Sequence, residues 1–343
     1  MKNGSPREAA RAAPERDAVE GGFLSGACEG RVALVTGASR GGIGTAIALR
    51  LAVEGARVAI TARGKPGLDE TAARIADAGG SALVLPADLS DPRGERQHLV
   101  ARAEAELGPI DILVNSAAAG GYKPLEAWRT SELEKLQQTN VYAPWELMAA
   151  VLPGMRARKR GWILNLTSFA GELPPGPPFP SSGPARQGSA YGGTKAALNR
   201  VTLSCAVETH GQGIAVNALA PQAAAETRDL VAAGWIEQHW YEPLETMAEA
   251  ALALCTGDPL RLTGRIAYSL QLLVELARPV RDLRGKVLAP GWQPQDLPAV
   301  IARQLAAHEK SGWPRAYDFG RPSSPPVCVP PPRTASSSHQ TRN

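Results

Sequence analysis

A phenol and an amine lie one helical turn apart in the middle of the chain. Tyr191 and Lys195 occupy positions i and i+4 of a predicted helix, so their side chains share one face. An unperturbed tyrosine has a pKa near ~10, and a neighbouring ammonium group favours the phenolate and lowers that pKa. Ser168 follows an apolar, strand-like run and offers a hydroxyl to an oxygen on which negative charge develops. These three side chains predict proton transfer at a hydroxyl or carbonyl oxygen.

A glycine-rich segment lies between an apolar run and a helical pattern near the N-terminus. It reads TGASRGGIG over residues 36–44. Glycines let the backbone turn sharply and approach a pyrophosphate, and the following helix supplies free N–H groups and a partial positive charge. In this context the segment predicts a dinucleotide site rather than an ordinary strand-to-helix turn. The expected contact residues are Gly37, Ser39, Arg40, Gly42, Ile43 and Gly44.

An arginine, rather than an acid, follows the tip of the second predicted strand. In dinucleotide-binding folds an acid at about this place binds the ribose 2′-hydroxyl of NAD. A guanidinium can instead pair with a 2′-phosphate through a charge-assisted contact. Arg63, together with Arg40 in the glycine loop, therefore predicts NADP(H) in preference to NAD(H). The alternative is that both are solvated surface arginines.

Short apolar runs alternate with longer helical patterns, and these elements must position the groups above. The predicted strands cover residues 32–36, 57–61, 82–86, 111–115, 162–167, 213–219 and 262–268. The predicted helices between them cover residues 43–54, 68–78, 91–107, 131–158 and 189–210. Nearly continuous apolar strands that alternate with helices indicate a parallel sheet covered on both faces. We therefore expect an α/β fold with a Rossmann-like, doubly wound parallel sheet and ligands at the carboxyl ends of its strands.

We expect one Rossmann-fold domain with further segments before and after it in the sequence. Six prolines in residues 174–184 predict a stiff loop inserted into that domain. Two amphipathic patterns, 269–278 and 295–309, predict a short helical extension. The expected segments are a disordered leader (1–30), the domain (31–268), the helical extension (269–313) and a disordered Pro/Ser-rich tail (314–343).

Composition and charge limit the class of protein. The chain has 343 residues, 44% of them hydrophobic and 20% charged, as in globular proteins. The net charge is +4, and no block of lysines and arginines interrupted by aromatic residues occurs in the central region, so we expect no nucleic-acid partner. No apolar run approaches the roughly 18 residues of a membrane span. We expect a cytoplasmic protein without a membrane partner.

Four cysteines are widely spaced and form no C-x-x-C motif. Cys28 and Cys328 fall in the expected leader and tail. Cys205 and Cys255 stand among apolar residues, where a free cysteine behaves as a small core hydrophobe. We therefore expect neither disulfides nor a metal site.

The set of motifs resembles the short-chain dehydrogenase/reductase family, in its compact branch with a TGxxxGxG-type loop. The resemblance covers about residues 30 to 268. Besides the segments above, it rests on Asp88-Leu89, on NSAA from Asn115, on Asn140 within TNVYAP and on NALAP, which ends at Pro221. It implies a Rossmann fold and hydride transfer between a nicotinamide ring and the carbon that carries the reacting oxygen.

The resemblance also implies roles for single residues. It assigns a catalytic tetrad to Asn140, Ser168, Tyr191 and Lys195, in which Tyr191 transfers the proton. By the same resemblance Lys195 also holds the nicotinamide ribose, and Asn140 anchors a water of the proton relay. Asp88 and Leu89 are expected near the adenine, Asn115 and Ala117 near the adenine ribose, and Pro221 and Thr227 near the nicotinamide. The alternatives are a turn cap for Asp88, a strand-end cap for Asn115 and a helix-interrupting polar group for Asn140.

Four features depart from the family pattern. Six residues separate Gly37 from Gly44, where the pattern has five, and we expect the extra residue within 38–41. The family's NNAG reads NSAA, and Gln222 replaces the usual glycine after Pro221. The interval from Ser168 to Tyr191 is 23 residues, about ten more than the family leads us to expect, because it includes the proline-rich segment.

The combined prediction is an NADP(H)-dependent oxidoreductase that interconverts a hydroxyl and a carbonyl on a small apolar substrate. We expect a homodimer or homotetramer. One alternative is a nucleotide-sugar epimerase or dehydratase of the extended branch, which the TGxxxGxG-type loop and NALAP disfavour. The other is a non-catalytic dinucleotide-binding protein, which the complete Asn/Ser/Tyr/Lys set disfavours.

Overall fold

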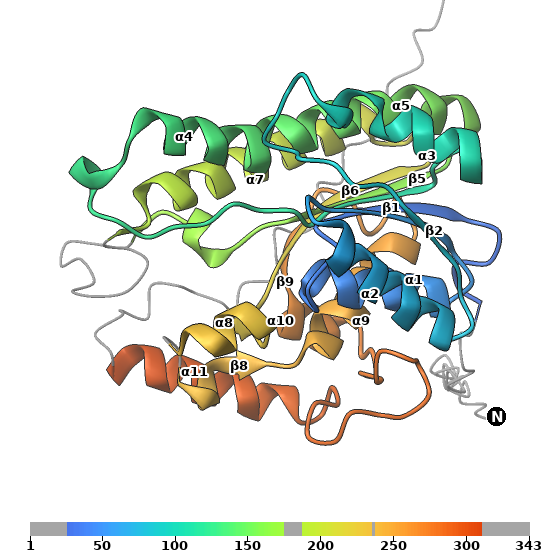
Figure 1. Ribbon diagram of the computed structural model, residues 1–343. Helices are drawn as coiled ribbons and strands as arrows, with labels where there is room; N and C mark the ends of the chain where they lie inside the picture. Colours follow the sequence, from blue (N-terminus) through green and yellow to red (C-terminus); the bar gives the residue numbers. More distant parts are fainter. Residues whose placement is uncertain (1–25, 175–186, 235–236, 311–343) are drawn as a thin grey trace, which may run out of the picture.

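Seven parallel strands form the central sheet, in the order β3-β2-β1-β4-β5-β6-β9 (Figure 1). The computed structural model describes residues 26–174, 187–234 and 237–310. The strands alternate in sequence with helices, so each connection crosses over one face of the sheet. The strands are β1 (Val32–Thr36), β2 (Arg57–Thr61), β3 (Ala82–Val84), β4 (Ile112–Asn115), β5 (Gly161–Leu166), β6 (Ile214–Ala220) and β9 (Ile266–Tyr268).

Helices cover both faces of this sheet (Figure 1). One layer contains α1 (Ile43–Val53), α2 (Lys65–Asp77), α9 (Leu244–Thr256), α10 (Ser269–Glu275) and α11 (Leu297–Lys310). The other layer contains α3 (Leu99–Leu107), α5 (Ala143–Arg158) and α7 (Ser189–Thr209), with α4 (Thr130–Gln137) beside α7. A small ribbon of β7 (Ala224–Ala225) and β8 (Tyr241–Glu242) and the short α8 (Arg228–Ala233) follow β6. The expected doubly wound parallel sheet is confirmed.

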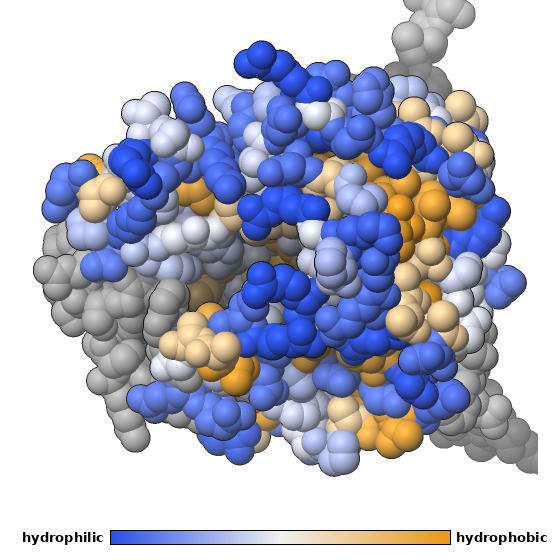
Figure 2. Space-filling model, viewed as in Figure 1, coloured by the Kyte–Doolittle hydropathy of each residue, from blue (hydrophilic) through white to orange (hydrophobic). Residues whose placement is uncertain are grey.

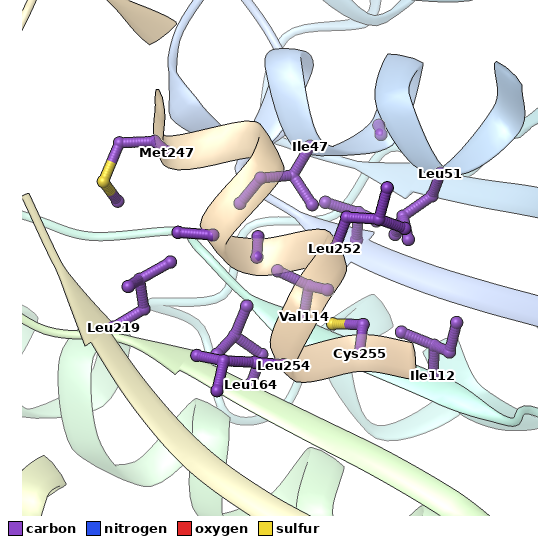
Figure 3. Packing of buried hydrophobic residues seen from close by; sticks show 14 of the residues in the cluster. Ile47, Leu51, Ile112, Val114, Leu164, Leu219, Met247, Leu252, Leu254 and Cys255 are labelled. Atoms are coloured by element: carbon purple, nitrogen blue, oxygen red, sulfur yellow. The ribbon is translucent and has the colours of Figure 1, made fainter. Parts of the chain in front are cut away.

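The core consists of two apolar clusters, one on each face of the sheet. Every residue of β5 and of β6 is buried, as expected for strands covered on both sides. In Figure 3, Leu252 of α9 lies beside Leu51 of α1, and Leu254 of α9 lies beside Leu164 of the sheet. Helix α9 thus packs between α1 and the sheet in one apolar cluster.

A predicted helix and a predicted strand differ from the observed elements. The helix expected over 131–158 is divided into α4 and α5 by a π-helical turn, Gln138–Tyr142, in which Asn140 is buried. The strand expected from residue 262 begins only at Ile266, because Gly264 has a left-handed φ of 70° and breaks the extended chain. The ribbon of β7 and β8 was not predicted, since two-residue strands carry no periodic signal.

The N-terminal boundary of the domain lies earlier than the sequence predicted. Cys28 is fully buried in the core, and its backbone N–H donates to the carbonyl of Glu54 at 2.8 Å. The expectation that residues 26–30 belong to a disordered leader is therefore wrong. The Cys28 side chain packs in the core as a small apolar group. Cys205 and Cys255 are buried, as predicted. Residues 1–25, the tail 314–343 and the proline-rich loop after Pro174 lie outside the described residues.

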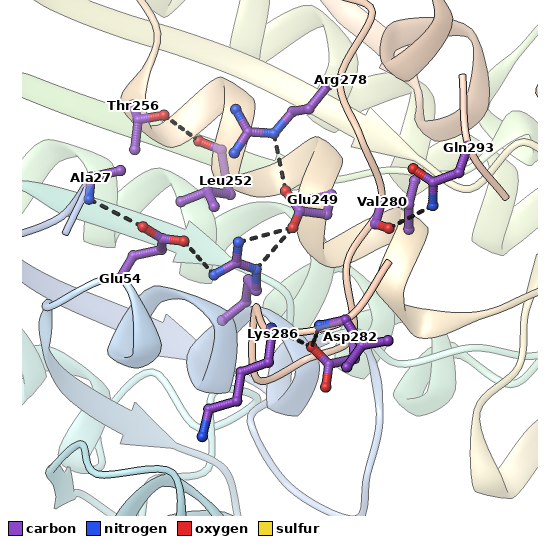
Figure 4. Close-up of polar contacts among 12 residues, drawn as sticks. Ala27, Glu54, Glu249, Leu252, Thr256, Arg278, Val280, Asp282, Lys286 and Gln293 are labelled. Carbon is purple, nitrogen blue, oxygen red and sulfur yellow. Dashed lines mark hydrogen bonds and ion pairs between the residues drawn. The ribbon is translucent and has the colours of Figure 1, made fainter. Parts of the chain in front are cut away.

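A buried network of charges fastens the C-terminal segment to the domain (Figure 4). The guanidinium of Arg50 in α1 donates to Glu54 at 2.5 Å and to Glu249 of α9 at 2.9 and 3.0 Å. Arg278 donates to the second oxygen of Glu249 at 3.0 Å. Leu270, Leu297 and Val300 belong to the same core cluster as α1. Residues 269–310 therefore pack as part of one domain.

Candidate active site

A cleft of about 1240 Å³ opens at the carboxyl ends of β1 and β4, where the strand order reverses direction. Figure 2 shows this face of the molecule hollowed near its centre, between the half that carries α4 and the half that carries α2 and α8. Most of the predicted site residues line this cleft. They are Gly37, Ser39, Arg40, Gly42, Ile43, Gly44, Arg63, Asp88, Leu89, Ala117, Tyr191, Lys195 and Thr227.

The additional residue of the glycine loop is accommodated by a tight turn. Arg40 and Gly41 both have left-handed φ angles, 60° and 67°, and the N–H of Gly42 donates to the carbonyl of Ser39 at 3.3 Å. Two consecutive positive φ values closed by this bond are the signature of a type I′ turn. The extra residue thus lies within 38–41, as expected, and the entry into α1 at Gly42 is unchanged.

The start of α1 can hold the pyrophosphate of a dinucleotide. A Cβ on Gly37 would lie 2.7 Å from the backbone of Ala117, and a Cβ on Gly44 would lie 2.6 Å from the carbonyl oxygen of Gly37. Only glycine therefore permits this approach of strand, loop and helix. Gly42 precedes α1 without a side-chain cap, and no acid stands in the first helical turn. The N–H groups and the positive end of the helix dipole remain available to an anion, so the residues present fit a nicotinamide dinucleotide.

Helix α7 carries the proposed acid–base pair along the cleft wall. Tyr191 and Lys195 both line the cleft, and the Lys195 Nζ lies 5.7 Å from the centre of the Tyr191 ring. Lys195 is buried and donates to the carbonyl oxygen of Leu166 at 2.7 Å, which ties α7 to the end of β5. Ser168 follows β5 directly and shares a hydrogen bond with the Tyr191 hydroxyl. Ser168 itself is not among the residues that line the cleft, whereas Tyr191 and Lys195 are.

Burial is the main cause of the pKa shifts of Tyr191 and Lys195. It raises the pKa of the Tyr191 phenol far above its usual value, the nearby Tyr122 raises it further, and the bond with Ser168 only partly opposes this. The predicted lowering of the Tyr191 pKa by Lys195 and the oxidised nicotinamide ring concerns the cleft with its cofactor bound, and it stays a prediction. Burial also lowers the pKa of Lys195 to about 8. At neutral pH Tyr191 holds its proton, and Lys195 is a cation poised near deprotonation.

Asn140 lies behind the cleft rather than in its lining. Its side-chain amide donates to the carbonyl of Ala119 at 2.8 Å and to the Thr194 hydroxyl at 2.9 Å, and its oxygen accepts from the N–H of Ala119 at 2.8 Å. Asn140 thereby joins the π-helical turn to the loop after β4 and to α7. It positions the wall that carries Tyr191.

Asn115 and Pro221 are likewise not among the residues that line the cleft. The Asn115 side chain is buried and donates to Asn165 on the neighbouring strand β5 at 2.8 Å. The expected contact of this side chain with the adenine ribose is therefore not supported. The adjacent Ala117 does line the cleft, and its N–H donates to the Thr36 hydroxyl at 3.1 Å.

Charged residues surround the end of the cleft that lies beside β2 and β3. Asp88 accepts from the backbone N–H of Ser90 at 2.9 Å and from its hydroxyl at 2.7 Å. Although partial burial opposes it, these bonds and the positive charges of Arg63 and Lys135 hold the pKa of Asp88 below its usual value. Arg63 is exposed and makes no hydrogen bond or salt bridge to the part of the chain that the structure describes.

Two salt bridges join α8 to the opposite lip of the cleft. Arg40 in the glycine loop pairs with Asp229 at 2.8 Å, and Arg228 pairs with Glu70 of α2 at 2.8 Å. Both pairs are largely exposed. Arg40, unlike Arg63, is thus already engaged by a carboxylate.

Residues that the sequence did not single out lie along the remaining wall or directly behind it, and Tyr122 is one of those behind it. The Tyr122 ring meets the Tyr191 ring edge-on, with centroids 5.8 Å apart. Lys123 lies over the Trp128 ring at 4.9 Å and pairs with Glu132 at 2.6 Å, and all three of these residues line the cleft. Most of this wall belongs to the irregular chain after β4, which no periodic pattern could assign.

Two further observations concern metals and membranes. Within residues 26–174, 187–234 and 237–310, no group of histidine, cysteine and acidic side chains is arranged to hold a metal ion. None of the helices in the described part of the chain combines the length and apolar character that a membrane crossing requires.

Known proteins match this chain over the sheet and the cleft. The sequence model of the short chain dehydrogenase family matches residues 31–231. A short chain dehydrogenase of Pseudocercospora fijiensis is 36% identical over 212 residues, which cover 61% of this chain and 62% of that protein, less than two thirds of its length. The 3-oxoacyl-[acyl-carrier-protein] reductase of Vibrio cholerae is 37% identical over 246 residues, or 70% of this chain and 89% of that protein.

The fold also matches a solved enzyme that holds a cofactor. The crystal structure of a 3-oxoacyl (acyl-carrier-protein) reductase from Agrobacterium tumefaciens, with NADP bound, superposes with a TM-score of 0.62 at 31% identity. The match covers 71% of this chain and 94% of that one. The shared fold is thus accompanied by recognisable sequence similarity.

Proposed function

The chain belongs to the short-chain dehydrogenase/reductase family, and we propose that it is an NADP(H)-dependent oxidoreductase that interconverts a carbonyl and a hydroxyl. One observation supports this most strongly. Tyr191 and Lys195 line the same cleft as the glycine loop and the start of α1. A dinucleotide whose pyrophosphate lies at α1 and whose nicotinamide extends toward α7 would place its reactive ring beside the phenol.

Tyr191 is proposed as the proton donor and acceptor. Its raised pKa keeps the phenol protonated at neutral pH, which is the form that donates to an oxygen gaining negative charge. Ser168, which bonds the Tyr191 hydroxyl, can donate to the same oxygen and stabilise the charge. When bound, the nicotinamide supplies the hydride chemistry at the carbon that carries this oxygen.

Lys195 and Asn140 are proposed to support this proton transfer. The buried Lys195 ammonium lies close enough to stabilise the phenolate that remains after proton donation. Asn140 fixes Ala119 and Thr194 on the two walls of the cleft, so it holds Tyr191 in register with the loop that faces it. The roles of the four residues agree with the tetrad that the family resemblance implies.

We propose NADP(H) over NAD(H) because Arg63 offers an exposed guanidinium, free of bonds to the described residues, at the end of the cleft away from Tyr191. A 2′-phosphate is the group that such a guanidinium binds best. No carboxylate follows the tip of β2 to receive a 2′-hydroxyl instead. The Agrobacterium reductase structure, which contains NADP, is consistent with this choice.

We propose an apolar ketone or alcohol as the substrate. The cleft wall near Tyr191 contains Ala118, Ala119 and the indole of Trp128, and the Tyr122 ring packs edge-on against Tyr191. Small apolar and aromatic side chains favour an acyl or ring skeleton around the reacting carbonyl. The 3-oxoacyl reductases among the similar proteins point the same way.

We also propose a homodimer or homotetramer formed through α5 and α7. Trp145 in α5 is 55% exposed, Tyr142 directly before α5 is 50% exposed, and Val207 on α7 is 79% exposed. Large apolar side chains exposed on neighbouring helices are typical of an interface between subunits.

The proposed function is tested by following absorbance at 340 nm with NADPH and a panel of β-ketoacyl thioesters, cyclic ketones and sugars. We expect turnover of apolar ketones, and a loss of at least about 100-fold in kcat for Tyr191→Phe, with NADPH binding unchanged. Tyr122→Phe is the matched control, because it removes the neighbouring phenol hydroxyl and should retain activity. Binding of NADPH without turnover of any compound would contradict an oxidoreductase.

A further inference from the structure

A fully buried carboxylate lies behind the segment that leads from β6 into the cleft wall. Glu242 in β8 has no exposed surface, and each of its carboxylate oxygens accepts two hydrogen bonds. Burying a carboxylate without partners is costly, whereas several well-placed donors make it tolerable. Where those donors lie in the chain therefore shows what the carboxylate organises.

One oxygen of Glu242 binds the backbone directly after β6. It accepts from the N–H of Gln222 at 2.5 Å and from the N–H of Ala223 at 3.3 Å. The other oxygen accepts from the Thr246 hydroxyl of α9 at 2.5 Å and from the Ser269 hydroxyl of α10 at 2.7 Å. The carboxylate thus joins the loop after β6 to the beginnings of two core helices.

The backbone of Glu242 restrains the same segment a second time. Ala225 of β7 pairs with Glu242 of β8, and the N–H of Glu226 donates to the Glu242 carbonyl at 2.9 Å. The next residue, Thr227, caps α8 through its hydroxyl, which accepts from the N–H of Leu230. Thr227 lines the cleft, and so does Asp229, two residues further on in α8.

We propose that Glu242 is a positioning residue that sets the path of residues 222–227 and thereby places Thr227 against the nicotinamide half of the bound cofactor. This inference rests on the proposed function, since it assumes a dinucleotide in the cleft. Glu242 is fully buried and is not among the residues that line the cleft, so we infer that it acts through the backbone that it holds. Gln222, where the family usually has a glycine, joins this arrangement through its backbone N–H.

Glu242→Leu removes the acceptors while keeping an apolar side chain of similar size, and Glu242→Gln keeps one acceptor oxygen. The Gln oxygen can accept from Gln222 and Ala223, and its amide can donate to the hydroxyls of Thr246 and Ser269, which rotate to accept. We expect Glu242→Leu to weaken NADPH binding, measured by calorimetry, and to raise its KM by about tenfold, with kcat within about threefold of wild type. Glu242→Gln should restore both values to within about threefold.

Hydrogen exchange supplies a readout that does not depend on activity. The amide of Ala223 should exchange at least about tenfold faster in Glu242→Leu than in wild type, because its acceptor is gone. The amide of Gln222 should change less, because it also donates to the Ser269 hydroxyl at 3.0 Å. Glu249→Leu is the matched control, since it also removes a fully buried carboxylate of the same layer, but one bound to Arg50 and Arg278. It should destabilise the fold and leave the Kd for NADPH unchanged.

The possible outcomes separate the two proposals. If wild type does not bind NADPH, the proposed function fails. If wild type binds NADPH and a folded Glu242→Leu binds it equally well, the role of Glu242 is refuted. Should Glu242→Leu not fold, the variant Thr246→Val decides, since it removes one donor to the Glu242 carboxylate and keeps the Ser269 hydroxyl, which also accepts from the N–H of Gln222 at 3.0 Å. An NADPH Kd raised at least about threefold in that variant supports the proposal, and an unchanged Kd overturns it.

Discussion

Replacing Arg63 tests the cofactor preference. The Arg63 guanidinium binds nothing in the described chain, so it can meet a 2′-phosphate without first breaking a bond. A hydrogen bond to a charged group contributes about 1.5–3 kcal/mol, and the exposure of Arg63 to solvent favours the lower end. Arg63→Ala should therefore weaken NADPH binding by roughly tenfold. NADH lacks the phosphate, so its affinity should change by less than about twofold.

Replacing Asp229 should change the affinity for NADPH in the opposite direction. Arg40 must leave its salt bridge with Asp229 before it can bind a phosphate, and an exposed pair of this kind contributes about 0.2–1 kcal/mol. Asp229→Asn should release Arg40 and tighten NADPH binding by roughly 1.4- to 5-fold. Glu70→Gln is the control, because it weakens the neighbouring bridge to Arg228 and leaves Arg40 paired.

Fluorescence titration with each cofactor measures these changes for all three variants. The ratio of the Kd values for NADH and NADPH separates a lost phosphate contact from general damage to the cleft. Equal losses of NADH and NADPH affinity in Arg63→Ala would refute the reasoning. They would show that Arg63 maintains the structure of the cleft and does not bind the 2′-phosphate.

Three further predictions concern titration, stability and assembly. Because burial lowers the pKa of Lys195 to about 8, the ammonium is lost as pH rises through that value, and kcat/KM for ketone reduction should fall above about pH 8. A flat profile from pH 7 to 9 would contradict this assignment. Glu249→Ala leaves Arg50 and Arg278 without their shared carboxylate, so it should cost about 3–5 kcal/mol and lower Tm in calorimetry by at least about 6 °C. An unchanged Tm would show that the network does not stabilise the fold. Trp145→Arg should shift sedimentation toward monomers, whereas unaltered sedimentation would place the subunit interface elsewhere.

Much of the fold could be predicted because its signals are local and periodic. The apolar run Val32–Thr36, the glycines after it and the helical pattern from Ile43 specify β1, the loop and α1 by their own residue types. The same is true of Tyr191 and Lys195, whose spacing of four fixes a common face whatever surrounds them. These predictions needed no knowledge of distant residues.

The features that the sequence did not predict have a different cause. Each concerns a residue whose environment is set by contacts with distant parts of the chain. Burial and the nearby Tyr122 raise the pKa of Tyr191 in this structure, and no spacing between positions 122 and 191 predicts that contact. Asn115 pairs with Asn165 across two strands, which turns it from the cleft into the sheet. Cys28 appeared to belong to a leader because its apolar partners lie in α1 and α9.

Helix α11 packs into the core, and this packing limits how far the chain can be shortened from its C-terminal side. Leu297 and Val300 complete the apolar cluster that also contains α1, whose first turn faces the cleft. A protein cut anywhere before residue 297 would expose that cluster to water and would lose support beneath its phosphate-binding helix. The segment that follows the Rossmann sheet in sequence is therefore an integral part of the domain, and deletion mapping should keep Leu297, Val300 and Ile301.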